Sequence, residues 1–208
     1  MPTPTYSNLS KASFTAGTNQ TVAHTPSGVD RIVFAWLMIE NTITNLSVTY
    51  SGNAMTLVDS ITTTNAAVHL YKYVNPPLTS QNCAATWTGN ATGWLQVISY
   101  SNVNQFIPLG TTSKASSNSS TTPSVTVTSA VGELVIDGVS AHVAFTATGA
   151  GQTVKITETT VVNVRGSEEA GAASVVMDWT LGSASNWASI GVSLKPSPGG
   201  GNILMNYL

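Results

Sequence analysis

Charge is the property that this sequence has least of. Its 208 residues include 7 Lys and Arg and 9 Asp and Glu, so charged residues make up 8 % of the chain and the formal net charge is −2. A typical soluble domain carries about 25 % charged residues. The chain therefore lacks the basic excess by which a protein attracts a nucleic acid, and it has no acidic tail. We expect no nucleic-acid partner.

Cysteine and long apolar runs are scarce as well. Cys83 is the only cysteine, so no disulfide can form within the chain. No apolar run approaches the roughly 20 residues of a membrane span. Residues 1–8 carry neither the charged region nor the apolar region of a secretory signal. These absences predict a protein that is made in a reducing cytosol, is used without cross-links and has no membrane partner.

Strong helix formers are also few, whereas residues that favour strands and turns abound. The sequence contains 30 Thr, 25 Ser and 16 Asn, together a third of the chain, and 42 % of all residues are hydrophobic. This apolar content is sufficient for a core, and turn residues recur at the spacing of about 8 to 12 positions that is typical of a sandwich or barrel. The sequence predicts an all-β chain without helices, folded as an antiparallel β-sandwich with a jelly-roll-like topology.

Three stretches carry specific expectations about strands. Residues 31–40 form a continuous apolar run bounded by charges, which predicts a central strand buried on both faces. Residues 83–87 and 94–100 read as two strands joined by a loop. The Ser- and Thr-rich residues 111–123 are interpreted as an exposed loop or a linker half-way along the chain.

Two pairs of segments indicate an internal repeat. Residues 25–34 resemble residues 128–136, because each has a turn, an acidic residue and then an apolar strand. Residues 87–94 resemble residues 179–187, because in both a strand ends in Trp and the chain restarts with Trp after a small polar loop. Two related halves would suit a double Greek key. The alternative is that a low-complexity β sequence produces such matches by chance.

The predicted organisation has three parts. Residues 1–19 form an N-terminal arm, residues 20–196 form the sandwich with halves at about 20–110 and 124–196, and residues 197–208 form a Gly-rich hinge with an apolar tail. We hypothesise that the tail docks on a neighbouring subunit, and the alternative is that it folds back on its own domain. The tail residues expected to serve assembly are Ile203, Leu204, Met205, Tyr207 and Leu208.

No catalytic constellation can be assembled from the titratable residues. His24, His69 and His142 each stand alone, without a Cys, His or Asp at zinc-ligand spacing. The adjacent Glu168 and Glu169 would point to opposite faces of an extended chain, so we interpret them as a solvated turn and not as a glycosidase pair. Nucleophile elbows and phosphate-binding loops are absent from the sequence. We therefore expect no enzyme activity, no metal and no cofactor.

Aromatic residues permit one hypothesis about binding. Trp87 and Trp94 flank a loop of Gly, Asn and Thr, and Tyr71 lies with His69 and Tyr73 on one face of a predicted strand. Exposed aromatic rings stack well on sugars, so Tyr71, Trp87 and Trp94 are candidate glycan contacts. The alternative, which the recurrence of Trp at strand ends favours, is that the tryptophans belong to the core of the sandwich.

Three motifs carry a resemblance to a known group of proteins. They are Val48-Thr-Tyr-Ser-Gly-Asn-Ala-Met-Thr-Leu-Val58, Leu70-Tyr-Lys-Tyr-Val-Asn-Pro-Pro77 and the stretch from Met177 to Pro196. Over roughly residues 20–196 the chain resembles jelly-roll-like β-sandwich structural proteins of tailed bacteriophages, which serve as virion decoration or fibre modules. It is also similar to some bacterial surface β-sandwich modules. The resemblance implies a virion or surface module and transfers no catalytic residue.

Composition and resemblance together lead to an expectation about function. We expect a virion structural protein, most simply an outer capsid decoration or cement subunit, made in the host cytoplasm. Its partners would be other copies of itself, with a trimer as the favoured form, and the major capsid protein or other virion proteins. The alternatives are a fibre or receptor-binding module that recognises host glycans, and a bacterial cell-surface adhesin module.

Overall fold

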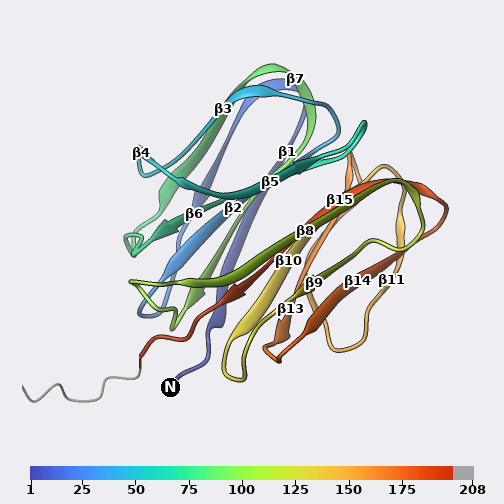
Figure 1. Ribbon diagram of the computed structural model, residues 1–208. Coiled ribbons are helices and arrows are strands. Elements are labelled where there is room, and N and C mark those ends of the chain that lie inside the picture. Colours follow the sequence, from blue (N-terminus) through green and yellow to red (C-terminus); the bar gives the residue numbers. More distant parts are fainter. Residues whose placement is uncertain (199–208) are drawn as a thin grey trace, which may run out of the picture.

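The computed structural model describes residues 1–198 and contains fifteen strands in that range, all in antiparallel pairings (Figure 1). The first seven strands are β1 (Thr5–His24), β2 (Ile32–Ile39), β3 (Thr44–Tyr50), β4 (Asn53–Ala54), β5 (Thr56–Thr62), β6 (Ala67–Val74) and β7 (Gln81–Ser101). The other eight are β8 (Leu109–Ser120), β9 (Ser124–Val127), β10 (Leu134–Ala141), β11 (Phe145–Thr148), β12 (Thr153–Glu158), β13 (Asn163–Ala170), β14 (Val175–Leu181) and β15 (Ser185–Leu194). The predicted all-β antiparallel sandwich is confirmed. Among the described residues there is no helix able to cross a membrane.

Strands β1 to β7 form a first unit, which is one curled sheet. Its order is β4-β3-β7-β2-β6-β5, and β1 pairs with β7 along its length. The first half of β7 pairs with β3 and its second half pairs with β2. Because one strand belongs to two faces, the sheet folds back over itself and nearly closes.

Strands β8 to β15 form a second unit from two separate sheets. The larger sheet has the order β12-β13-β10-β15-β8, and the smaller one has the order β11-β14-β9. The break between β14 and β15, and the break between β8 and β9, divide strands whose counterparts β7 and β1 are continuous in the first unit.

The two units share one topology. The order β5-β6-β2-β7-β1 in the first unit corresponds to β12-β13-β10-β15-β8 in the second, and β3-β7-β1 corresponds to β11-β14-β9. Both are jelly-roll-like, with two facing sheets joined by Greek-key connections, although β5 and β12 extend the larger sheet. The predicted pair of related halves is therefore present in the connectivity of the strands.

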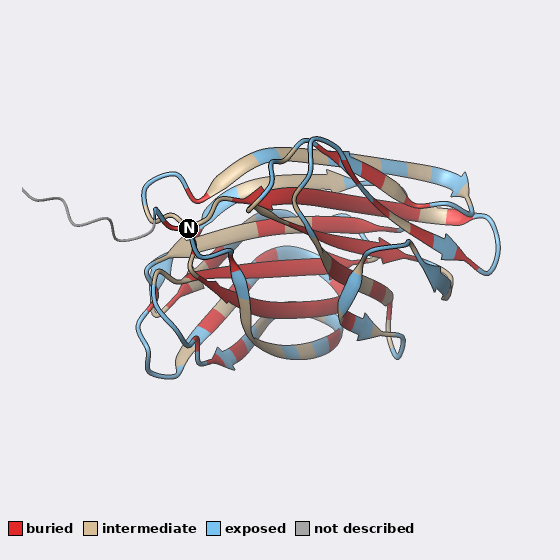
Figure 2. Ribbon diagram, turned by 90° about the horizontal axis from the view of Figure 1, so that it is seen from below, coloured by how far each residue is buried: buried red, intermediate tan, exposed pale blue. Residues whose placement is uncertain are grey.

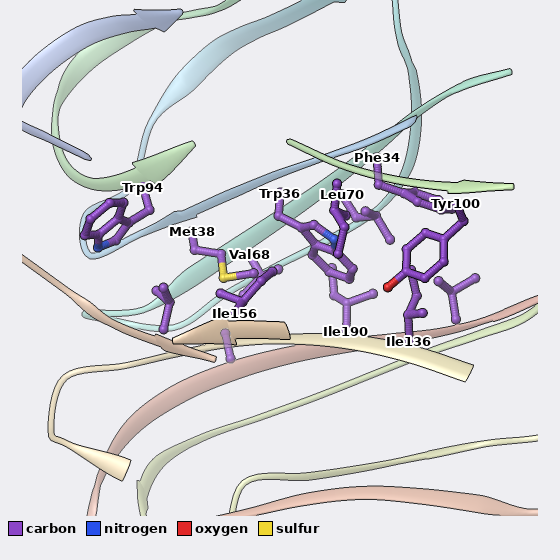
Figure 3. Packing of buried hydrophobic residues seen from close by; sticks show 14 of the residues in the cluster. Phe34, Trp36, Met38, Val68, Leu70, Trp94, Tyr100, Ile136, Ile156 and Ile190 are labelled. Atoms are coloured by element: carbon purple, nitrogen blue, oxygen red, sulfur yellow. The ribbon is translucent and has the colours of Figure 1, made fainter. Parts of the chain in front are cut away.

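The largest core lies between the units (Figure 3). Phe34, Trp36 and Met38 on β2 face Ile136 on β10 and Ile190 on β15, and all five are buried. A second cluster fills the interior of the first unit, and two smaller clusters fill the second unit.

Strand β2 belongs to both of the larger cores. All eight of its residues are buried, which confirms the prediction of a central strand buried on both faces. Figure 2 shows the buried residues concentrated in the inner strands. The two units are thus parts of one folded body.

The units face each other with the approximate two-fold relation of an isologous dimer. In the first unit, Trp36 and Lys11 both pair with Gln96, and in the second unit Gly138 and Lys114 both pair with Ile190. Trp36 and Gly138 therefore occupy the same position. They also touch each other, because a Cβ atom on Gly138 would lie 2.6 Å from the Cε3 atom of Trp36. A position that contacts its own counterpart lies near the two-fold axis.

Ion pairs across the interface repeat this relation. Lys11 on β1 pairs with Glu158 on β12, and Lys114 on β8 pairs with Asp59 on β5 at 2.7 Å. Each pair joins the edge strand of one unit to the opposite edge strand of the other unit, as an isologous contact requires.

Several predicted boundaries are corrected by the structure. The predicted arm at residues 1–19 is strand β1 from Thr5 onward, and the predicted loop at residues 111–123 lies largely within β8. Both are edge strands, so their polar side chains remain in water while the backbone pairs on one side. Residues 88–93 continue β7 without a break, and the linker between the units is residues 102–108.

Candidate functional site

The five tail residues predicted to serve assembly lie outside the described residues, which end at Pro198. The predicted glycan contacts lie within them and are not brought together at the surface. Trp87 is buried in the first unit, where its Nε1 donates to the Gly17 carbonyl at 3.0 Å and its ring lies 4.9 Å from that of Phe14. Trp94 is buried in the core between the units (Figure 3). Tyr71 alone is partly exposed, so both tryptophans behave as core residues.

The histidines do not gather into a cluster within the described residues. His24 is buried, and its ring nitrogens lie 3.1 Å from the Ser10 hydroxyl and 2.9 Å from the Ser99 hydroxyl. Burial lowers the pKa of His24 to about 4, and it lowers the pKa of His69 equally. Within residues 1–198, no group of three or more His, Cys, Asp or Glu side chains is placed to hold a metal ion.

Asp137 is a buried carboxyl that sequence reasoning did not single out. Its Oδ1 atom accepts from the backbone and hydroxyl of Ser167 at 2.8 and 2.7 Å, and its Oδ2 atom accepts from Trp179 Nε1 at 2.7 Å. Burial raises the pKa of Asp137 to about 6, even though these three hydrogen bonds oppose the shift. An acidic residue within the apolar run of β10 was the signal that marked it. Asp137, Ser167 and Trp179 are all buried, so the carboxyl is enclosed together with the groups that donate to it.

Glu168 and Glu169 lie in strand β13, which corrects the prediction of a solvated turn. They point to opposite faces, as expected of neighbours on an extended chain. A cavity of about 320 Å³ adjoins both, and Glu133, Thr3 and Pro4 contribute to its walls. Glu168 is neutralised by Lys155 at 2.9 Å, and burial raises the pKa of Glu169, with the Asp178 charge adding to the effect. The carboxylates of Glu133, Glu168 and Glu169 thus line one cavity.

The clearest surface feature is a gathering of exposed apolar side chains at one end of the molecule. The strands that start or finish there are tied together by their register, because Ile32 pairs with both Val74 and Tyr100 in the first unit, and Leu134 pairs with Leu194 in the second. The loops at this end are residues 25–31, 75–80, 102–108 and 128–133. Six of the nine exposed large hydrophobic residues lie in these loops or at the chain start: Met1, Val29, Leu78, Phe106, Ile107 and Val131. We call this set the apolar end.

Hydrogen bonds join three of these loops, residues 25–31, 75–80 and 102–108, to one another. Arg31 donates to the Pro76 carbonyl at 3.0 and 3.1 Å, which ties the first two loops together. The backbone of residues 102 and 103 donates to residues 29 and 30, and Asn104 donates to Lys195 at 2.9 Å. The side chains of Phe106 and Val131 are 92 % and 94 % exposed, so almost their whole apolar area faces water.

The opposite end of the molecule differs in chemistry. Its loops contain Glu40 and His142, whose side chains approach to 3.8 Å, together with Asn, Thr and Gly. None of the exposed large hydrophobic residues of the described chain lies there, since the remaining three, Leu57, Val154 and Val176, are on strands. Apolar exposure is therefore concentrated at one end and is not scattered, which is the pattern that marks an interaction surface. Sequence reasoning missed this surface, because it depends on loops that are far apart in the chain.

Comparison with known proteins adds no identity: no protein-family model, no curated protein and no solved structure matches this chain. The resemblance to phage modules stays an expectation from the sequence motifs. A function for the chain is therefore proposed from its sequence motifs and its geometry together.

Proposed function

We propose that this chain is a structural subunit of a bacteriophage virion, acting on the outside of the capsid as a decoration or cement protein. The observation that carries the proposal is the apolar end, where Phe106 and Ile107 on the linker 102–108 and Val131 on the loop 128–133 expose their side chains. Burying such side chains against a neighbour contributes roughly 1.5–3 kcal/mol for each one that becomes fully buried. A protein that works by association needs such a surface and needs no catalytic group.

The remainder of the surface supports the same proposal. With only 8 % charged residues, the chain carries little of the charge that keeps a freely diffusing protein apart from its neighbours. The edge strands β1 and β8 present mostly Ser, Thr and Asn side chains, which can pack against another protein surface without leaving a buried charge. Two jelly-roll units fused through an extensive core give a rigid body for this purpose.

The copy number of the chain in purified particles from its source tests the proposal. Quantitative mass spectrometry against the major capsid protein is expected to give a ratio near one or a simple fraction of one. A ratio of a few per cent would argue against a shell subunit and indicate a fibre or receptor-binding module instead. Complete absence from the particles would overturn both virion functions and leave the surface-module alternative.

A further inference from the structure

We propose that the apolar end binds the apolar segment 203–208 of a second copy of this chain. This inference rests on the proposed assembly function and names the partner. Segment 203–208 reads Ile-Leu-Met-Asn-Tyr-Leu, so five of its six side chains are apolar or aromatic. It follows Gly199-Gly-Gly201, a composition that restricts the backbone little.

The place where the chain leaves the described fold supports this pairing. Ser197 donates from its backbone to the Asn102 carbonyl at 2.7 Å and from its hydroxyl to Asp30 at 2.5 Å. Val103 and Pro196 form an isolated bridge beside these contacts. The exit point is thus fixed between residues 25–31 and the linker 102–108, in the middle of the apolar end. Each copy therefore has an apolar surface at the end where the chain leaves the described fold, and an apolar segment follows in the sequence.

Residues 199–208 are long enough, when extended, to reach a neighbouring molecule. Ten residues follow Pro198, and an extended chain spans at most about 3.3–3.6 Å per residue, or roughly 35 Å in all. That length crosses the end of a domain of this size.

The proposed assembly function favours a second copy over the chain's own surface, because a segment folded back on its own molecule would cover the surface that assembly uses. Pro196 and Pro198 hold Lys195 and Ser197 in extended conformations up to the end of the described fold. Two copies that meet through their apolar ends can each supply a segment to the other, which is the reciprocal contact of an isologous pair.

Sedimentation velocity and multi-angle light scattering of the purified full chain test this inference. We expect the wild-type chain to shift from monomer to dimer or larger species as its concentration rises. A chain ending at Pro198 and the double variant Phe106→Ser/Ile107→Ser are both expected to need at least tenfold higher concentration for the same shift. Leu57→Ser is the control, since Leu57 is an exposed apolar residue on strand β5 and outside the loops that form the apolar end, and it should behave as wild type.

A second measurement, the binding of a peptide, distinguishes a lost contact from a folding defect in the variants. A labelled peptide of residues 199–208 should bind the chain that ends at Pro198, and binding should weaken at least tenfold in the Phe106→Ser/Ile107→Ser background. Thermal unfolding should show that all variants remain folded. The inference is overturned if the full chain stays monomeric at every concentration, including the case in which the peptide still binds, because the segment then covers its own molecule. It is also overturned if the shortened chain associates as strongly as the full one.

These outcomes are separable from the copy-number test. A chain that is abundant in particles but monomeric in solution refutes only the pairing through segment 203–208. A chain that associates as expected but is missing from particles refutes only the virion function.

Discussion

The two units have one topology but different interiors. Ala35 in the first unit and Asp137 in the second occupy the same strand position, because they pair with Val97 and Gly191 at the same place in their sheets. Trp87 and Trp179 also lie at matching places, buried between the two layers of each unit. The Trp87 ring donates to a backbone carbonyl, whereas the Trp179 ring donates to the Asp137 carboxylate. Both units therefore keep a buried indole at this position, but its hydrogen-bond acceptor differs between them.

A second matched position shows the same rule. Ser99 and Ser193 lie at corresponding positions of β7 and β15. Ser99 bonds the His24 ring at 2.9 Å, and Ser193 bonds the Ser129 hydroxyl at 2.9 Å and the Glu133 carboxylate. Each unit thus has a polar network at this position, with different partners for the serine. The two units also differ in a buried titratable group, which is His24 in the first unit and Asp137 in the second.

The largest expected effect is the pH dependence of stability. Asp137 titrates at about 6 in the folded chain against 3.8 for a free carboxyl, so the folded state holds a proton that the unfolded state has lost. Its contribution is full below pH 3.8 and is lost as pH rises towards 6, by about 3 kcal/mol in total. His24 titrates at about 4 against 6.5, so its contribution is full above pH 6.5 and is lost as pH falls, by a similar amount of about 3 kcal/mol.

The two contributions oppose each other between pH 4 and 6.5, where His69, whose pKa burial also lowers to about 4, acts in the same direction as His24. Removing either Asp137 or His24 should therefore change the slope of stability against pH. Relative to wild type, Asp137→Asn should lose stability more steeply as pH falls through this window. His24→Asn should lose it less steeply. Urea unfolding at half-unit pH steps measures both slopes. Identical pH profiles for the wild type and the two variants would show that these groups are not titrating as their burial requires.

The next effect compares the two buried indoles directly. Trp179→Phe removes one donor from a fully buried carboxylate, whereas Trp87→Phe frees the carbonyl of Gly17, a residue that is partly open to water. Both changes remove the same atoms, so the difference between them isolates the hydrogen bond. At pH 7 we expect Trp179→Phe to cost about 1–3 kcal/mol more than Trp87→Phe in free energy of unfolding.

Denaturant unfolding of the two variants side by side provides the measurement. The double variant Trp179→Phe/Asp137→Asn should recover part of the extra loss, because the acceptor is then no longer a charge. Equal losses in the two single variants would mean that the acceptor makes no difference to the stability of either unit.

The features that sequence reasoning recovered are those with a strong local pattern. Residues 31–40 predicted β2 because an apolar run between charges can only be buried, and the paired Trp motifs indicated two related halves. The polar strands were missed. Residues 5–19 and β8 have no apolar alternation, since edge strands with one free side tolerate Ser and Thr throughout. The repeated tetrapeptides Ser10-Lys11-Ala12-Ser13 and Ser113-Lys114-Ala115-Ser116 would have matched these two strands.

The candidate site was less predictable than the fold. Val29, Leu78 and Phe106 lie in three loops separated by many residues, and each alone is an ordinary exposed side chain. Only the pairing of β2 with both β6 and β7 brings those loops to one end. Trp87 and Trp94 stand out in the sequence, so they were candidates for glycan contacts, but both side chains are buried and this does not favour that hypothesis.

The smallest expected effect tests the two-fold relation between the units. Lys11→Met removes the pair with Glu158, and Lys114→Met removes the pair with Asp59. Both lysines are nearly half exposed, at 44 % and 47 %, so each pair is partly screened by water. We expect each variant to lose less than about 1 kcal/mol, with both losses shrinking as salt rises.

The comparison of these two variants is informative because the pairs lie on opposite sides of one interface. They share no partner, so the loss in the double variant should equal the sum of the single losses within about 0.5 kcal/mol. Lys114 also donates to the Ser60 carbonyl at 3.0 Å, which should make its loss the larger of the two by a small margin. Urea unfolding of the four proteins at low and high salt measures these differences. A loss of several kcal/mol from either lysine alone would mean that one side of the interface stabilises the pair of units far more than the other side does. The two-fold relation would then hold for the arrangement of the strands and not for the free energy of unfolding.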